Sequence, residues 1–133
     1  MGKVVSSAAN NYDKAKVMTE IHGASDTLDV PTLYRDTMDH FSKGINLMVP
    51  HAVWYNAYGS GFMNPNLTYD DATWGSVLPE YNEYVGRTAS LLQKGRHVAD
   101  IGVVYPIASL QTDYSFAIDY DRYKGGITPK AQW

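Results

Sequence analysis

The chain has 133 residues, a formal net charge of −3 and a sequence pI near 5.7. Its eleven Lys and Arg residues are scattered along the sequence, so we expect no nucleic-acid partner and no membrane partner. The absence of cysteine excludes disulfides and thiolate metal sites but leaves the cellular compartment open.

The first fifty residues read as a helix, a strand, a second helix and a second strand. The spacing of apolar residues predicts a helix over 3–13, strands over 15–19 and 45–49, and a helix over 31–43. Pro31 suits the first turn of that helix, and Gly44 can adopt the left-handed conformation that ends it. Five of its residues are predicted to face inward: Leu33, Tyr34, Thr37, Met38 and Phe41.

The remainder of the chain begins with a long segment rich in Gly, Pro, Asn and Asp, over 55–78. A helix is then predicted over 79–95, followed by a buried strand over 98–105. No assignment follows for 113–120. The inward face of the predicted helix consists of Tyr81, Tyr84, Val85, Thr88, Leu91 and Leu92.

Chemically active side chains follow both predicted strands. Glu20 and the flexible Gly23 follow the first strand, and His51 follows the second. Two parallel strands joined by a helix, with polar groups at both strand exits, are typical of neighbouring units of a (β/α) barrel. A complete eight-stranded barrel needs roughly 250 residues. The predicted fold class is therefore α/β, as a partial (β/α) barrel formed by its last strand–helix units.

Five short runs, in this order, resemble one family of enzymes. They are residues 6–12 (SSAANNY), the strand ending in Glu20, residues 44–51 (GIN with PH at the end), residues 87–95 (RTASLLQKG) and residues 99–106 (ADIGVVYP). Together they resemble large bacterial glycoside hydrolases of the α-L-rhamnosidase type. The chain has His22 where that family usually has an aromatic residue, and Thr19 where a Ser often precedes the Glu.

This resemblance implies a division of the chain into two parts. Residues 1–97 correspond to the C-terminal portion of the catalytic (β/α)₈ barrel, and residues 98–133 to the incomplete start of a following α/β or β domain. About six of the eight barrel strands, together with the second catalytic carboxylate, then lie outside the chain. The implied activity is hydrolysis of terminal glycosidic bonds, with an oligosaccharide or glycoside as substrate. The implied compartment is bacterial, either periplasm or cytoplasm, and residues 1–7 lack the apolar core of a secretory signal.

Glu20 is the candidate catalytic residue. Glycosidases place two carboxyl groups about 5 Å apart when one attacks the sugar, and about 6.5–9.5 Å apart when one activates water. The sequence does not decide whether Glu20 is nucleophile, base or acid. The alternative is a solvated glutamate at a strand end.

Five further residues are candidates for substrate binding. His51 could donate a hydrogen bond to a sugar hydroxyl or orient Glu20. Trp54 could stack on the face of a sugar ring, with Tyr55 and Asn56 at the rim, in a chain that contains eleven Tyr and three Trp. His22 follows Glu20 by two positions, so an extended strand would direct both side chains the same way. For His51 and Trp54 a purely structural role is the alternative.

The sequence predicts no metal and no other cofactor. Glu20, His22 and His51 have no further ligand at a recognisable spacing, and the pair Asp70–Asp71 resembles a calcium loop only superficially. Calcium therefore has no support from a motif. A small nucleotide-binding enzyme is disfavoured, because no phosphate-binding glycine loop is present.

The rival hypothesis is a non-catalytic module. The chain could be a carbohydrate-binding or interaction module, or a gene remnant, whose exposed barrel edge is covered by self-association or by the remainder of the barrel. Aromatic exposure and association state distinguish these alternatives.

Overall fold

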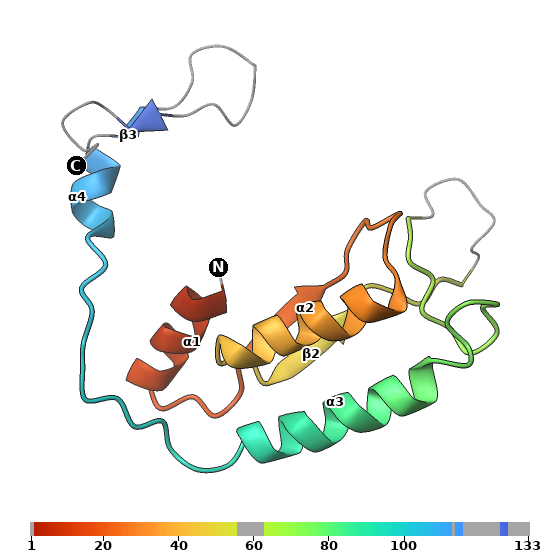
Figure 1. Ribbon diagram of the computed structural model, residues 1–133. Coiled ribbons are helices and arrows are strands. Elements are labelled where there is room, and N and C mark those ends of the chain that lie inside the picture. Colours follow the sequence, from red (N-terminus) through yellow and green to blue (C-terminus); the bar gives the residue numbers. More distant parts are fainter. Residues whose placement is uncertain (1, 56–62, 113, 116–125, 128–133) are drawn as a thin grey trace. The chain divides into compact units, whose positions relative to one another are not determined.

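The computed structural model describes residues 2–55, 63–112, 114–115 and 126–127. The chain divides into two units, Met1–His97 and Val98–Trp133. The first unit has the predicted order of elements, with ends shifted by at most three residues. Its helices and strands, shown in Figure 1, are α1 (Gly2–Asn11), β1 (Met18–Ile21), α2 (Val30–Ser42), β2 (Leu47–Pro50) and α3 (Leu78–Leu92).

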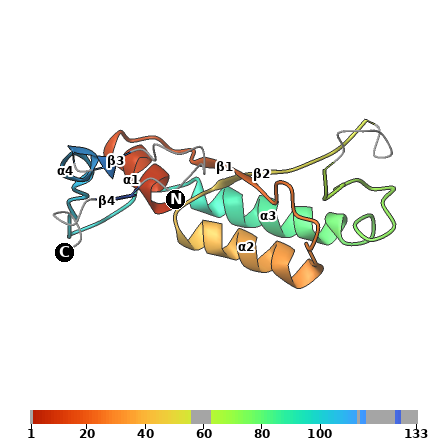
Figure 2. The ribbon, with the colours of Figure 1, turned by 90° about the horizontal axis from the view of Figure 1, so that it is seen from above.

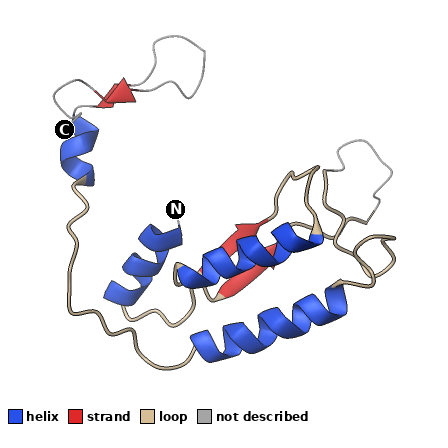
Figure 3. Cartoon of the chain, viewed as in Figure 1, coloured by secondary structure: helices blue, strands red, loops and turns tan. Residues whose placement is uncertain are grey.

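The two strands form a parallel pair that α2 connects. Met18 lies opposite Leu47, and Ile21 lies opposite Pro50, so both strands end at the same edge. Figures 2 and 3 show α2 and α3 side by side, with the strand pair next to them. This is the strand–helix–strand arrangement that the sequence predicts.

Two apolar clusters hold the first unit together. One joins the sheet to both helices and consists of Val17, Ile21, Phe41, Ile45, Met48 and Ala89. The other joins the first half of α2 to the start of α3 and to the segment before it, and consists of Leu33, Leu67, Trp74 and Tyr81. The second cluster anchors part of the long segment after β2 to the helices.

Asn46 links both strands to the end of α3. Its side chain is buried, and its Oδ1 accepts a hydrogen bond of 2.8 Å from the Val17 backbone N–H. Its Nδ2 donates to the carbonyl oxygens of Ala15, at 2.8 Å, and of Leu92, at 3.3 Å. The Gln93 side-chain amide donates to the Asn46 backbone carbonyl at 2.8 Å. Asn46 thus occurs in an apolar run because its side chain satisfies the hydrogen bonds of backbone groups there.

Pro31 and Gly44 lie at the two ends of α2 as predicted, and Asp29 adds a cap that the sequence analysis did not name. Asp29 caps the first turn, because its Oδ1 accepts a hydrogen bond of 2.8 Å from the Thr32 backbone N–H. Gly44 follows the helix with a φ of +86°, in the left-handed region. The buried Ser6 of α1 lies against this turn and donates from Oγ to the Lys43 carbonyl at 2.6 Å.

We expect Gly44→Ala to lower the free energy of unfolding by about 2 kcal/mol. A Cβ at Gly44 would lie 2.9 Å from the Ser6 Cβ, in addition to the cost of the left-handed backbone. Gly95→Ala is the matched control, because Gly95 has a φ of +82° with no atom within 4 Å of an added Cβ. Urea denaturation measures both changes. Equal losses in the two variants would contradict a role for the Ser6 contact.

Three of the residues predicted to face inward are exposed instead. Met38 is 55% exposed, because it follows the buried Thr37 by one residue, about 100° round the helix and away from the packed face. Leu91 and Leu92 are exposed in the last turn of α3, where Ala89 is the buried residue. The helix ends at Leu92 rather than at Gly95, and Gln93 binds Asn46 at that point.

One face of the sheet is covered by helices and the other is open. Thr19 and Ile21 alternate with Met18 and Glu20 along β1, and the latter two side chains are exposed. Leu47 and Val49 are the register partners of Met18 and Glu20, and both are exposed as well. The open face therefore carries apolar side chains next to a carboxylate.

The second unit differs from its prediction. Its described elements are α4 (Ile107–Thr112) and the antiparallel pair β3 (Tyr114–Ser115) and β4 (Gly126–Ile127). The predicted strand over 98–105 is wrong: these residues have no regular structure, and Val103 is 89% exposed. An apolar run becomes a buried strand only where a neighbouring strand pairs with it, and no described strand does so here.

Candidate functional site

Glu20 and His51 lie together at the ends of the paired strands. Glu20 is the third residue of β1, and His51 follows the last residue of β2. The His51 backbone N–H donates to the Ile21 carbonyl at 2.8 Å, which extends the strand pairing by one bond. The His51 Nδ1 consequently lies 3.5 Å from the Glu20 Oε1. The structure thus brings together the two residues that the sequence predicts at the strand exits.

The two side chains differ in solvent exposure. The Glu20 side chain is 68% exposed, whereas the His51 side chain is 15% exposed. The His51 Nε2 is buried and has no hydrogen-bond partner among the described residues. A neutral imidazole with its proton on Nδ1 would donate toward Glu20 and leave Nε2 as an acceptor. The pair therefore offers one accessible carboxylate and one fixed imidazole.

Gly23 lies beside this pair. A Cβ at this position would be 3.8 Å from the Glu20 Oε1 and 3.9 Å from the His51 Cγ, both ordinary contact distances. The backbone of the turn after β1 therefore passes directly next to the carboxylate and the imidazole.

His22 lies away from Glu20, in contrast to the prediction from an extended strand. It follows the end of β1 with a φ of +69°, which breaks the alternation of side chains. It is buried, whereas Glu20 is exposed. Burial lowers the pKa of His22, the nearby Asp36 carboxylate of α2 raises it, and His40 of the same helix lowers it. His22 thus faces α2 and is part of the packing.

We expect the first unit to lose stability as the pH falls below about 6.5, the ordinary pKa of an unfolded histidine. Because the pKa of His22 is lower in the folded chain, the unfolded chain binds more protons in this range. Stability is therefore fully present above this range and is lost as the pH falls through the folded pKa. Thermal unfolding between pH 7.5 and 5 measures the slope. His22→Gln flattens it, His97→Gln on the exposed end of the unit does not, and an unchanged slope in His22→Gln would contradict this role.

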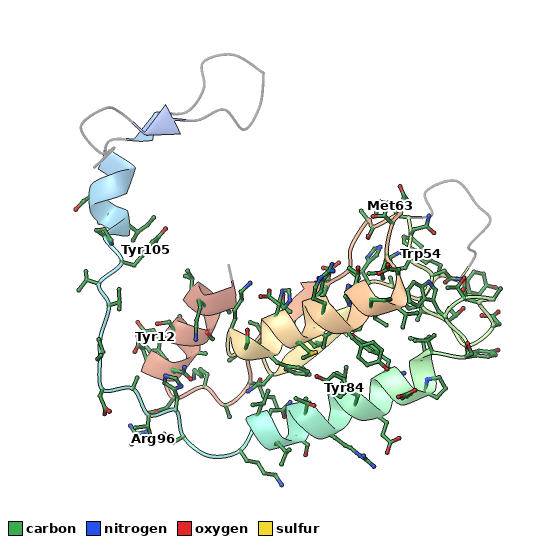
Figure 4. All side chains as sticks on the ribbon, in the orientation of Figure 1. Tyr12, Trp54, Met63, Tyr84, Arg96 and Tyr105 are labelled. Carbon is green, nitrogen blue, oxygen red and sulfur yellow. The ribbon has the colours of Figure 1, made fainter. Side chains whose placement is uncertain are left out.

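Trp54 lies next to His51. The ring centroids of His51 and Trp54 are 5.5 Å apart, with the planes at 79°, so the rings meet edge to face. Tyr55 is fully exposed. Asn56 lies outside the described residues. Figure 4 shows Trp54 near Met63, at the opposite end of the unit from Tyr12 and Arg96.

Trp54 and Tyr55 also line a cavity of about 540 Å³. Its polar and aromatic walls include Thr68, Tyr69, Asp70 and Asn82, and neither Glu20 nor His51 is among the lining residues. Residues 68–70 come from the segment before α3, and Asn82 from the first turns of that helix. Sequence reasoning missed them. The available signal was an aromatic residue directly followed by two carboxylates in a long segment between regular elements.

The structure adds two findings about metals and membranes. In the part of the chain that the structure describes, no three His, Asp or Glu side chains converge in a way that could hold a metal ion. None of the described helices is both long enough and apolar enough to cross a bilayer.

Neither a model of a protein family, nor a curated protein, nor a solved structure matches this chain.

Proposed function

We propose that the chain forms two strand–helix units of the catalytic barrel of a glycoside hydrolase of the α-L-rhamnosidase type. The observation that carries this proposal is the position of Glu20, exposed at the common end of two parallel strands and 3.5 Å from the His51 imidazole. Active sites of (β/α) barrels lie at this end of the strands. The resemblance of the sequence to that family supplies the substrate class.

In this proposal each residue has a separate task. Glu20 is one of the two carboxyl groups that flank the scissile bond, and the second belongs to a part of the barrel outside this chain. His51 orients Glu20 through Nδ1, which lies 3.5 Å from the Glu20 Oε1. Trp54 offers a ring edge and face next to the imidazole. No metal or other cofactor takes part.

We expect the isolated chain to bind L-rhamnose weakly and to hydrolyse no aryl rhamnoside, because one carboxyl group alone does not complete the reaction. Titration followed by ¹H–¹⁵N NMR is expected to shift the amides of Gly23 and His51. Glu20→Gln weakens this binding about tenfold, equivalent to ~1.4 kcal/mol. Glu80→Gln, an exposed glutamate in the first turn of α3, is the control.

Two results would overturn the proposal. One is the absence of any sugar-dependent shift at Gly23 or His51. The other comes from the coding DNA upstream of Met1, where the proposal requires an in-frame barrel with a second carboxylate at a strand end. A stop codon at that place would instead favour the alternative below.

The alternative is a non-catalytic carbohydrate-binding or interaction module. The open apolar face of the sheet, with Met18, Leu47 and Val49, favours it, because such a face needs a cover from another copy or another chain. A binding module stays monodisperse and loses sugar affinity with Trp54→Ala. A remnant self-associates in sedimentation experiments and binds no sugar.

A further inference from the structure

The cavity next to Trp54 has an aromatic wall. Trp54, Tyr55 and Tyr69 are among its lining residues. Tyr55 is fully exposed and Tyr69 is 89% exposed, so other side chains leave most of their ring surface free. The face of an aromatic ring carries partial negative charge, and a cation within about 6 Å of the ring centre is attracted to it. The cavity therefore offers three rings of the kind that bind positive charge.

The charge of the lining points to the same class of ligand. Asp70 is the one charged residue that lines the cavity in the described part of the chain, and no lysine, arginine or histidine accompanies it there. Its Oδ1 accepts a hydrogen bond from the Thr68 hydroxyl, which fixes the carboxylate without neutralising it. A carboxylate in a partly enclosed site attracts a cation and repels an anion. The lining therefore selects a positively charged ligand.

The wall of this cavity is tied to the end of β2 and to the core. The Leu67 backbone N–H donates to the Ala52 carbonyl at 2.9 Å. The Asp71 Oδ1 accepts from the backbone N–H groups of Thr73, at 2.8 Å, and Trp74, at 3.0 Å. Both Leu67 and Trp74 are buried in the second apolar cluster. The wall is thus formed before any ligand arrives, which lowers the entropic cost of binding.

The remaining lining decides which kind of cation fits. Val53, Leu67, Leu78 and Pro79 give it an apolar character. A primary ammonium carries three N–H donors and is costly to bury where they find no acceptors. A methylated ammonium presents apolar methyl groups, so it contacts aliphatic and aromatic side chains without this cost. The volume of about 540 Å³ lies in the usual range for small-molecule sites.

We propose that this cavity binds a small organic cation of the choline type, which carries a methylated ammonium group. The rings of Trp54 and Tyr69 contact the methyl groups, and the Asp70 carboxylate supplies the opposite charge. This inference goes beyond the proposed function and does not rest on it, because neither Glu20 nor His51 lines the cavity.

The test compares choline with 3,3-dimethyl-1-butanol, its neutral isostere, by calorimetry on the full chain. Choline is expected to bind about tenfold more tightly, because only choline is attracted to the carboxylate and to the ring faces. Asp70→Asn keeps the shape of the side chain and an acceptor for the Thr68 hydroxyl but removes the charge, so it is expected to abolish this preference. Tyr69→Ala is expected to weaken choline binding about threefold.

Three matched variants serve as controls. Asp100→Asn removes an exposed carboxylate elsewhere, and Tyr12→Ala removes an exposed tyrosine directly after α1. Glu20→Gln removes the carboxylate at the strand ends. All three are expected to keep the choline affinity of the unaltered chain. Because Tyr69 is exposed, its truncation leaves the circular dichroism spectrum unchanged.

Four results would overturn this inference. The first is equal binding of choline and its isostere, and the second is full choline affinity in both Asp70→Asn and Tyr69→Ala. The third is a loss of choline affinity in Glu20→Gln, which would place the cation at the strand ends. The fourth is a peptide with one trimethyllysine that binds more tightly than choline, which would assign the cavity to a protein partner. In each case rhamnose-dependent shifts at His51 still support the proposed function.

Discussion

Asn46→Ala is expected to lower the free energy of unfolding of the first unit by about 3 kcal/mol, because the substitution leaves the buried Val17 N–H without an acceptor and removes two part-buried hydrogen bonds. The Val17 N–H loses its acceptor, and the carbonyls of Ala15 and Leu92 lose their donor. Asn46 is itself buried, so its truncation to alanine leaves a cavity that freely exchanging solvent does not fill. This loss is a large fraction of the stability of an ordinary domain of this size.

Two further variants isolate the cause. Asn46→Asp keeps an acceptor for Val17 but loses the Nδ2 donor and buries a charge, so we expect it to be no more stable than Asn46→Ala. Asn11→Ala, at the exposed end of α1, controls for the loss of an asparagine as such. Equilibrium denaturation in urea measures all three. A loss below about 1 kcal/mol in Asn46→Ala would show that these hydrogen bonds do not hold the strands.

The same substitution is expected to reach the candidate site. Asn46 ties the beginnings of β1 and β2 together, and their far ends carry Glu20 and His51. We expect the amide resonances of Gly23 and His51 to broaden in Asn46→Ala, because the register of a two-stranded sheet depends on few bonds.

The elements of the first unit could be predicted because their signals are local. Asp29, Pro31 and Gly44 mark the ends of α2 through capping and backbone conformation, which depend on neighbouring residues alone. The start of β1 could not be predicted, since the Val17 N–H binds a side chain 29 residues away rather than the opposite strand. The exposed run over 98–105 could not be assigned correctly for a similar reason. Whether an apolar run forms a strand depends on a second strand that pairs with it.

Some residues of the candidate site could likewise be placed from the sequence, and others could not. Glu20 and His51 could be brought together from sequence, since parallel strands joined by a helix end at one edge. The departure of His22 depends on a left-handed conformation of His22 itself, directly after the strand, and a histidine at that position does not indicate such a conformation. The cavity was missed because Tyr69 and Asp70 belong to a segment without periodicity, whose path is set by the burial of Leu67 and Trp74.

Tyr81→Ala is expected to cost about 3–5 kcal/mol, the usual range for removing a buried aromatic side chain. Tyr81 is 1% exposed and meets the Tyr34 ring edge to face, with centroids 5.4 Å apart and planes at 89°. It also packs in the apolar cluster with Leu67 and Trp74, which anchor the wall of the cavity. We therefore expect Tyr81→Ala to loosen the segment that contains Leu67 and Trp74 along with lowering stability, as measured by urea denaturation and by broadening of the Leu67 amide resonance.

The phenol of Tyr81 contributes separately from its ring. Its hydroxyl lies 2.8 Å from the hydroxyl of Thr37, which itself donates to the Leu33 carbonyl at 2.9 Å. The Thr37 proton is thus committed, so Tyr81 is the donor. Tyr81→Phe removes a donor and costs about 1 kcal/mol, whereas Thr37→Val leaves a buried phenol O–H without an acceptor and costs about 1–3 kcal/mol.

The double variant Thr37→Val/Tyr81→Phe separates the cost of the lost hydrogen bond from the cost of an unsatisfied phenol. Replacing both partners by apolar groups of similar shape removes the unsatisfied phenol, so the double variant is expected to be more stable than Thr37→Val alone. A double-mutant cycle in urea gives the coupling between the hydroxyl groups as the departure from additivity. Strict additivity would mean that the hydroxyl groups act independently and that ring packing alone accounts for Tyr81. A coupling of about 1 kcal/mol between the two hydroxyl groups would show that this buried pair helps to align α2 with α3. The segment that Leu67 and Trp74 anchor beside Tyr81 depends on this alignment.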